Sequence, residues 1–270
     1  MKIRWRAALA AFCLLLAGAD ARAGEAPGLG PWVVAGHSAA RLVATTDGQA
    51  WRGPVLAGLH IRLDAGWHTY WRTPGDAGLP PMLDFSGSRN LARYDVLWPV
   101  PKRAHESGLE TFVYYDEVIL PITIEATDRR KPVALRLELL YGVCREICIP
   151  EQASLALDLP AAGAVPVPTA AAGLIDRYLA QVPGPAARMG LAPHGPAGEG
   201  RLAFSSDRPL AAPFAIVEYP GVFARALEPE FLSADRRRVG YNLESILDRK
   251  GPAPRLLLID GERAAELPLR

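Results

Sequence analysis

Cysteine and methionine are scarce in this chain, which has three of each among 270 residues, and histidine occurs only five times. No Met-rich or His-rich tract of the kind that gathers metal ions is present. Catalytic motifs are also lacking: there is no Gly-x-Ser-x-Gly, no His-Glu-x-x-His, no phosphate-binding glycine loop and no paired Cys-x-x-Cys. These absences argue against a catalytic hydrolase, and we expect no cofactor and no metal.

Long hydrophobic runs and an excess of charge are absent as well. Beyond the N-terminal region no stretch reaches roughly 18 uninterrupted apolar residues, and the most apolar one, 161–175, is broken by Pro166 and Pro168. The whole chain carries a net charge of +1, and removing the net +3 of residues 1–23 leaves −2. We therefore expect a mature chain without a transmembrane segment and without affinity for nucleic acid or anionic membranes.

The N-terminus has the pattern of a secretory signal peptide. Three positive charges precede an apolar run from Ala7 to Ala19, and the small-x-small motif Ala21-Arg22-Ala23 follows it. The run is too short to span a bilayer, so we predict export and cleavage after Ala23. Cleavage removes Cys13 and leaves two cysteines in an oxidising compartment, where a close pair is a disulfide unless something reduces it.

Most of the mature chain has the pattern of short β-strands. Apolar and polar residues alternate in several segments, and clusters of Gly, Pro and Asp separate them, at the spacing typical of a β-sandwich. The clearest segments in the first half are Ala39–Thr46, Val55–Leu63, Val133–Leu139 and Ser154–Leu159. A second group follows at Arg201–Phe204, Phe214–Tyr219, Arg237–Leu243 and Arg255–Asp260. The sequence therefore predicts an all-β protein with two β-rich parts.

One helix is expected between these parts. Thr169 is a candidate N-cap, Leu174 to Val182 carries an apolar face, and Pro183-Gly184-Pro185 ends the pattern. The resulting organisation is a signal peptide over 1–23, a β-sandwich over 24–161, a linker with its helix over 162–186, and a smaller β-rich domain over 187–270.

Cys144 and Cys148 lie between two predicted strands, Val133–Val143 and Ala153–Leu159. A turn at this point brings their Cα atoms within the ~4.4–6.8 Å that a disulfide requires. Because the closed loop is very small, such a bond stabilises a fold less than one that closes a long loop. Redox chemistry and a local structural staple are both open from the spacing alone.

The neighbours of the pair have opposing effects. Arg145 favours a thiolate at Cys144, and Glu146 opposes it, so the sign of the net effect on the thiol pKa is open. Pro150 lacks a backbone donor and is expected to end the turn before the outgoing strand.

Five segments together resemble one family. They are Val143–Glu151 around the cysteines, Gly66–Pro81 with its Pro-Gly-Asp-Ala-Gly motif, Trp98–Pro101, Leu120–Ile122 and Leu258–Glu266. These segments are similar to the N-terminal periplasmic domain of the DsbD/ScsB thiol:disulfide interchange proteins, with the ScsB-like branch as the nearest resemblance. The likeness extends over nearly all of the mature chain.

The resemblance implies an immunoglobulin-like β-sandwich in the periplasm with Cys144 and Cys148 as its redox-active pair. It implies a protein-disulfide reductase-type oxidoreductase component that takes electrons from a membrane-embedded or thioredoxin-like donor and passes them to oxidised periplasmic thiol proteins. Larger relatives continue into a transmembrane conduit and a thioredoxin-like domain. Neither follows here before Arg270, so we expect a stand-alone soluble chain that collects electrons from a separate protein.

In the DsbD branch an aromatic cap loop shields the disulfide from stray oxidation. The corresponding segment, Lys102–Leu109, contains no aromatic residue, and its His105 and Glu106 have the pattern of a surface loop. Either Phe112, Tyr70 or Trp71 then provides the shield, or the pair is more exposed. The full set of candidate neighbours of the redox site is His68, Tyr70, Trp71, His105, Phe112, Arg145, Glu146 and Pro150.

Individual neighbours also have simpler interpretations. His68 and Tyr70 share one face of a strand, where they either adjoin the disulfide or belong to an ordinary half-buried aromatic strand. We favour the structural interpretation for His68 and leave Tyr70 open. His105 is most simply a surface-loop residue, and Asp76 a turn residue that satisfies local backbone donors.

Two rival functions remain. Soft thiolate ligands select Cu(I), and the ScsB-like branch is associated with copper stress. Cys144 and Cys148 could therefore form a copper site with His68 or His105. In that case the chain is a copper-binding or copper-tolerance protein. The other rival is a non-catalytic β-sandwich adaptor whose disulfide is only structural.

Overall fold

The computed structural model describes residues 28–45, 55–106, 108–161, 171–193, 200–243 and 253–269. The predicted signal peptide, Cys13 and Thr169 lie outside these ranges. In the described part of the chain, no helix is both long enough and apolar enough to cross a bilayer.

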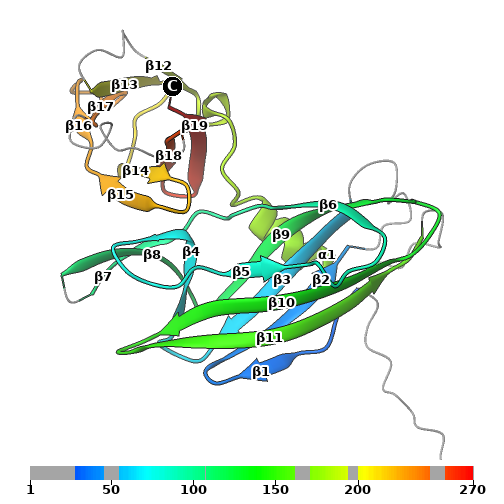
Figure 1. The fold of residues 1–270 in the computed structure, drawn as a ribbon. Coiled ribbons are helices and arrows are strands. Elements are labelled where there is room, and N and C mark those ends of the chain that lie inside the picture. Colours follow the sequence, from blue (N-terminus) through cyan, green and yellow to red (C-terminus); the bar gives the residue numbers. More distant parts are fainter. Residues whose placement is uncertain are drawn as a thin grey trace, which may run out of the picture.

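Two antiparallel sheets face each other in the first half of the chain (Figure 1). The first has the order β1 (Val33–Ala35), β2 (Ser38–Ala44), β3 (Val55–Leu63), β9 (Glu117–Ala126), β6 (Leu91–Val96). The second has the order β11 (Cys148–Leu159), β10 (Val133–Cys144), β4 (His68–Gly75), β8 (Leu109–Tyr115), β7 (Lys102–Glu106), with β5 (Met82–Asp84) also paired to β10. Strand β11 is therefore an edge strand.

Strand β10 shows how the alternating pattern builds the core. Its odd-numbered side chains from Leu135 to Val143 are at most 2 % exposed and form part of the main hydrophobic cluster between the sheets. Successive side chains of a strand point to opposite faces, so the even-numbered ones, from Arg136 to Cys144, lie on the outer face of the second sheet. The sulfur atoms are consequently placed outside the sandwich core.

The hairpin is anchored to the first sheet on its inner face. The Tyr141 hydroxyl and the Ser38 hydroxyl are 2.5 Å apart, and Ser38 also donates to the Glu151 carboxylate, which accepts the His37 backbone N–H at 2.7 Å. Burial raises the pKa of Tyr141 to about 12, so the phenol is neutral at ordinary pH. These contacts fix strands β10 and β11 against β2.

A short helix and a second β region follow. They comprise α1 (Ala172–Leu179), the 3-10 turn η2 (Ala186–Met189), one sheet of β12 (Leu191–Pro193), β13 (Arg201–Ser206), β17 (Arg238–Asn242) and β16 (Glu230–Phe231), and another of β15 (Phe223–Leu227), β14 (Pro213–Tyr219), β18 (Arg255–Asp260) and β19 (Arg263–Pro268). Helix α1 packs Ile175 against Val43 and Ile119 of the sandwich.

The expected fold, a mostly-β sandwich followed by a short helix and a smaller β region, is confirmed. Strands β3 and β18 have the predicted bounds, and β10 ends at Cys144, one residue beyond the predicted Val133–Val143. The helix is shorter than predicted: it begins at Ala172, with Ala171 at the N-cap and no side-chain cap. The domain boundary near 162–186 stays a prediction.

The expectation for residues 105 and 106 is wrong. His105 and Glu106 were expected to lie in a surface loop, but both belong to strand β7, Lys102–Glu106. The polar side chains of this segment do not show the apolar alternation of a buried strand, because β7 is an edge strand. It buries only part of its surface, notably Ala104.

The two β regions are joined by a buried ion pair. The Arg72 guanidinium on β4 donates to Glu218 on β14 at 2.6 Å and to Glu266 on β19 at 2.8 Å. Thr73 donates to Glu218 at 2.7 Å, and the Glu218 side chain is only 1 % exposed. Apolar side chains of β14, β15 and β18 also join the main core: Ile216, Ala224, Ala226, Leu257 and Ile259. The second β region thus packs directly against β4, the strand that carries Tyr70.

Candidate functional site: the Cys144–Cys148 disulfide

The two cysteines occupy directly opposite positions at the end of the β10–β11 hairpin. They form a disulfide with a Cα–Cα distance of 4.2 Å, and Arg145–Ile147 makes the turn between them. The pair therefore lies where the chain reverses, as the sequence predicts. The expectation for Pro150 is wrong: β11 already begins at Cys148, and Pro150 lies inside it opposite Gly142. A proline is tolerated there because β11 is an edge strand.

The two cysteines differ sharply in accessibility. Cys144 is 2 % exposed, whereas Cys148 is exposed, and the neighbouring Ile147 in the turn is 68 % exposed. A large reactant can therefore approach the Cys148 side of the bond, while Cys144 is covered.

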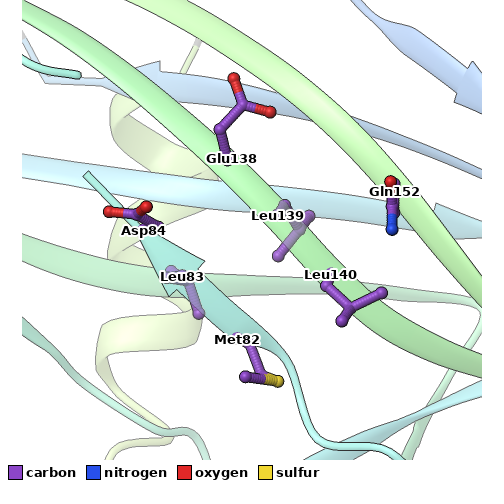
Figure 2. Close-up of a pocket in the computed structure, with 7 residues that line it drawn as sticks. All are labelled: Met82, Leu83, Asp84, Glu138, Leu139, Leu140 and Gln152. Carbon is purple, nitrogen blue, oxygen red and sulfur yellow. The ribbon is translucent and has the colours of Figure 1, made fainter. Parts of the chain in front are cut away.

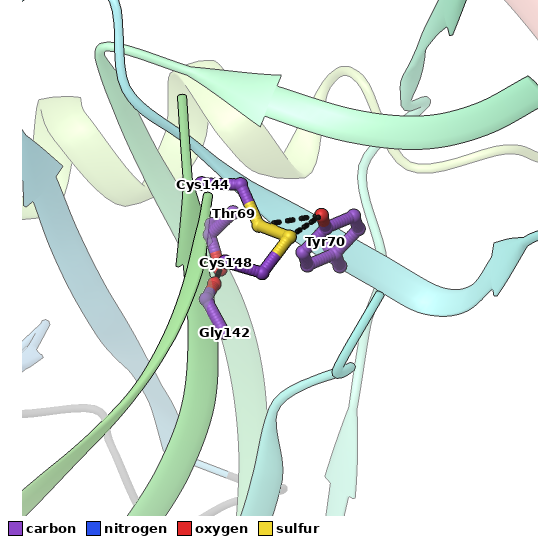
Figure 3. The surroundings of a disulfide bond; sticks show 5 residues. All are labelled: Thr69, Tyr70, Gly142, Cys144 and Cys148. Atoms are coloured by element: carbon purple, nitrogen blue, oxygen red, sulfur yellow. Dashed lines mark hydrogen bonds between the residues drawn. A yellow bond between two sulfur atoms is a disulfide. The ribbon is translucent and has the colours of Figure 1, made fainter. Parts of the chain in front are cut away.

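Tyr70 contacts both sulfur atoms (Figure 3). Its hydroxyl donates to Cys144 Sγ at 2.7 Å and lies 3.0 Å from Cys148 Sγ. Tyr70 is 3 % exposed, and its ring lies against Gly78. Position 78 requires glycine for two reasons: its φ is +116°, and a Cβ there would come within 2.3 Å of the ring. The Pro-Gly-Asp-Ala-Gly-Leu segment thus covers the phenol that contacts the disulfide.

Asp76 helps to fix this covering segment. Its carboxylate accepts the backbone N–H of Glu110 on β8 at 2.9 Å, and its own N–H donates to the Glu110 carbonyl at 2.8 Å. The expectation of a purely local turn role is wrong, since these bonds tie the segment to a strand 34 residues further along the chain.

A small apolar cluster surrounds Cys144 on the outer face of the sheet. Its buried members are Tyr70, Ala104, Val113 and Cys144, with Tyr115 packed against them. Ala104 and Val113 come from β7 and β8, and no sequence signal indicated either of them. Their contribution depends on the β4–β8–β7 pairing, which brings distant parts of the chain under the disulfide.

His68 lies in the same row as Cys144. It is opposite Cys144 in the β10–β4 register and opposite Tyr115 in the β4–β8 register, and it is 1 % exposed. Its ring makes edge contacts with Tyr70, at a centroid distance of 5.3 Å, and with Tyr115, at 5.5 Å. His68 therefore packs beside the tyrosine that contacts the sulfurs.

The other candidate neighbours are less close to the sulfurs. Trp71 and Phe112 belong to the main core, where their rings meet edge-to-face at 6.0 Å, so neither shields the disulfide. His105 is an exposed residue of β7, 3.8 Å from Glu110. Arg145 and Glu146 are both exposed in the turn, and their charged groups are 3.8 Å apart. Of the three aromatic candidates, Tyr70 is the one that contacts the bond.

No metal centre is apparent in the described ranges: no group of three or more His, Cys, Asp or Glu side chains is arranged to hold a metal ion. Cys144 and Cys148 are bonded to each other, and His68 packs against aromatic rings.

Fold and site together define a β-sandwich domain that carries a disulfide at the tip of an edge hairpin. Residues 39–160 match the family model described as thiol:disulfide interchange protein DsbD, N-terminal. This part of the chain belongs to the DsbD N-terminal domain family, and thiol–disulfide exchange is the function that the family implies.

One solved structure supports the fold. The N-terminal periplasmic domain of ScsB from Proteus mirabilis superposes with a TM-score of 0.63 at 20% sequence identity, over 90% of this chain and 97% of that one. The match therefore extends beyond residues 39–160 into the second β region. The reduced DsbD N-terminal domain of Neisseria meningitidis matches at 16% identity over 50% of this chain and 87% of its own, with a TM-score of 0.27 that supports no structural argument. The comparison with curated proteins found no match.

Proposed function

We propose that this chain is a periplasmic thiol–disulfide exchange protein that relays electrons through Cys144 and Cys148 to oxidised protein thiols. The observation that carries the proposal is the asymmetric disulfide: Cys148 is an exposed residue at a hairpin tip, Cys144 is buried, and one tyrosine hydroxyl contacts both sulfurs. A bond that closes so small a loop contributes little to stability, which favours a chemical role over a structural one.

We infer a separate task for each sulfur from this geometry. A thiolate of the electron donor attacks Cys148 Sγ, the Cys144–Cys148 bond breaks, and its electron pair passes to Cys144 Sγ. The Tyr70 hydroxyl stabilises this new thiolate by a hydrogen bond. The donor's second thiolate then attacks the mixed disulfide, so the donor leaves as a disulfide and Cys148 is released as a thiolate. The reverse sequence, beginning with attack by Cys148 on a client disulfide, delivers the two electrons.

The test is whether the bond opens while the protein is folded. We expect dithiothreitol and a reduced thioredoxin-type protein to reduce it without loss of the near-UV circular dichroism signal, measured alongside alkylation of the freed thiols. A Cys144→Ser/Cys148→Ser variant controls for non-specific alkylation. If reduction occurs only in denaturant, the disulfide is a structural staple and the proposal fails.

Removal of the Tyr70 hydroxyl is expected to slow exchange. In Tyr70→Phe the Cys144 thiolate loses a charge-assisted hydrogen bond, a loss of about 1.5–3 kcal/mol that corresponds to about tenfold or more in the rate of bond opening. Stopped-flow reduction by dithiothreitol measures the effect. Tyr178→Phe is the matched control, because its hydroxyl donates to the Glu117 backbone carbonyl instead. Equal rates for both variants would show that Tyr70 plays no part in exchange.

The partners in this proposal are a membrane-embedded or thioredoxin-like electron donor and oxidised periplasmic thiol proteins. The predicted signal peptide supports the location, as does the likeness to a solved domain described as periplasmic. Capture of donor or client as a mixed disulfide with Cys148 identifies them.

A further inference from the structure

We propose that the partner docks by adding an extended segment to the free edge of β11, beside Cys148, so that main-chain hydrogen bonds position its cysteine for exchange. This inference rests on the proposed function and specifies the partner: a cysteine-bearing segment that can become an extra strand. Strand addition to an exposed sheet edge gives affinity through backbone hydrogen bonds and specificity through alternate side chains.

The hydrogen bonds of Gly142 show which way the edge groups point. The Gly142 N–H donates to the Leu79 carbonyl at 3.0 Å, and the Gly142 carbonyl accepts the Thr69 hydroxyl at 2.8 Å. Both groups point away from β11, so Gly142 and its partner Pro150 form a non-hydrogen-bonded pair. Pairs of this kind alternate along an antiparallel ladder, so Cys144–Cys148 and Leu140–Gln152 belong to the same class.

The backbone groups of Cys148, Pro150 and Gln152 consequently point toward the open side of β11. These are the N–H groups of Cys148 and Gln152 and the carbonyls of all three residues. All three residues are exposed, and in the described sheet β11 has β10 as its one neighbour. The far end of the edge differs, since Gly30 lies so close to the Ala156 carbonyl that a Cβ on Gly30 would be 2.7 Å from it. The open stretch is therefore next to the reactive sulfur.

The chemistry of exchange brings a partner to this stretch. In the mixed disulfide the partner's Cα lies about 4.4–6.8 Å from that of Cys148, so the chain that flanks the partner's cysteine comes within reach of the edge of β11. Antiparallel addition continues the antiparallel sheet and is slightly more stable than parallel addition. The residue four positions before the partner's cysteine is then opposite Gln152. Pro150, in the middle of the edge, has a backbone carbonyl acceptor but no N–H donor. The partner segment therefore forms fewer main-chain hydrogen bonds with β11, which suits a partner that must dissociate after exchange.

An apolar groove lies on the same face, four residues along the hairpin from the disulfide, or about 13 Å. Figure 2 shows Met82 and Leu83 of β5 beside Leu140 of β10, with Gln152 on the neighbouring strand. Met82 is 56 % exposed. A large apolar side chain four residues before the partner's cysteine would lie over Gln152 toward this groove, so a peptide of the type Phe-x-x-x-Cys represents the partner.

Backbone methylation of such a peptide tests the docking mode. The Cys144→Ser protein without residues 1–23, in which Cys148 is the one cysteine, is reacted with the peptide carrying its cysteine as a thionitrobenzoate disulfide, and release of the chromophore gives the rate. N-methylation two or four residues before the cysteine removes a hydrogen bond to Pro150 or Gln152, and we expect the rate to fall about tenfold. N-methylation three residues before the cysteine, where the N–H points away from β11, should change the rate less than about twofold.

A protein variant gives a second measurement. Gln152→Pro removes an N–H that points to the open side and should lower the peptide rate about tenfold, whereas Gln152→Ala keeps that N–H and should retain most of the rate. The reaction with the small thionitrobenzoate reagent should be unchanged in both variants. Thermal unfolding checks the fold of the proline variant, and the methylated peptides decide the matter if it is unfolded.

The outcomes separate the two proposals. If Cys148 fails to react with the small reagent or any peptide, the proposed function fails. If it reacts, but all methylated peptides and both Gln152 variants behave alike, exchange stands and strand addition is overturned.

Discussion

A Cys144→Ser variant is expected to accumulate a mixed disulfide with its partner through Cys148, whereas Cys148→Ser should form one about 100-fold more slowly or not at all. The reason is accessibility: Cys144 is 2 % exposed and packs in a cluster with Tyr70, Ala104 and Val113, while Cys148 is exposed. Attack by Cys144 requires local opening of that cluster, and an opening of about 3 kcal/mol corresponds to this factor.

Both variants are incubated with periplasmic extract or with a purified disulfide-bonded client, and the covalent adducts are separated on non-reducing gels. The Cys144→Ser/Cys148→Ser variant shows which bands do not depend on either thiol. Equal trapping by the two single variants, or stronger trapping by Cys148→Ser, would contradict the assignment of Cys148 as the attacking sulfur.

Replacement of Glu218 by alanine should destabilise the protein by about 3 kcal/mol. The Glu218 carboxylate is 1 % exposed and accepts hydrogen bonds from Arg72 and Thr73 at the contact between β4 and β14. Its removal leaves the Arg72 guanidinium largely buried with one remaining carboxylate, Glu266, and breaking a buried pair costs about 3–5 kcal/mol. The lower end of that range applies because Glu266 still compensates part of the charge.

Urea unfolding followed by tryptophan fluorescence measures this loss. Glu230→Ala is the matched control: its partner Arg201 is also an arginine, but both side chains are more than half exposed, so the loss should be below about 1 kcal/mol. Hydrogen exchange should show in addition that Glu218→Ala loosens β4 next to Tyr70. An unchanged unfolding midpoint in Glu218→Ala would show that this ion pair does not hold the two β regions together.

Local patterns were sufficient for much of the fold. Strands Val55–Leu63 and Arg255–Asp260 were predicted to the residue, because alternating side chains on a half-buried strand are visible within a few positions. The cysteine hairpin was also predictable, since both cysteines lie within one turn. Strand β7 was missed because an edge strand with polar residues has the same composition as a loop.

The candidate site was predictable only in part. Tyr70 and His68 were selected because they share a face of one strand, but that pattern does not say which strand lies beside them. The contact between Tyr70 and Cys144 joins residues 74 positions apart in the sequence. The role of Gly78, which leaves room for the Tyr70 ring, is recognised only once the φ angle of Gly78 and the position of that ring are known. Trp71 and Phe112 were equally plausible shields from the sequence, and both lie in the core.

By itself the sequence determined the β-rich architecture, the hairpin and the closeness of Cys144 to Cys148, because periodicity and turn formation act over a few residues. Only the tertiary structure decided which cysteine is exposed, which tyrosine contacts the disulfide and which edge of the sheet is open beside it. Those properties depend on the pairing of strands β4, β7, β8 and β10 from separate parts of the chain, and burial is a consequence of that pairing rather than of any residue's own chemistry.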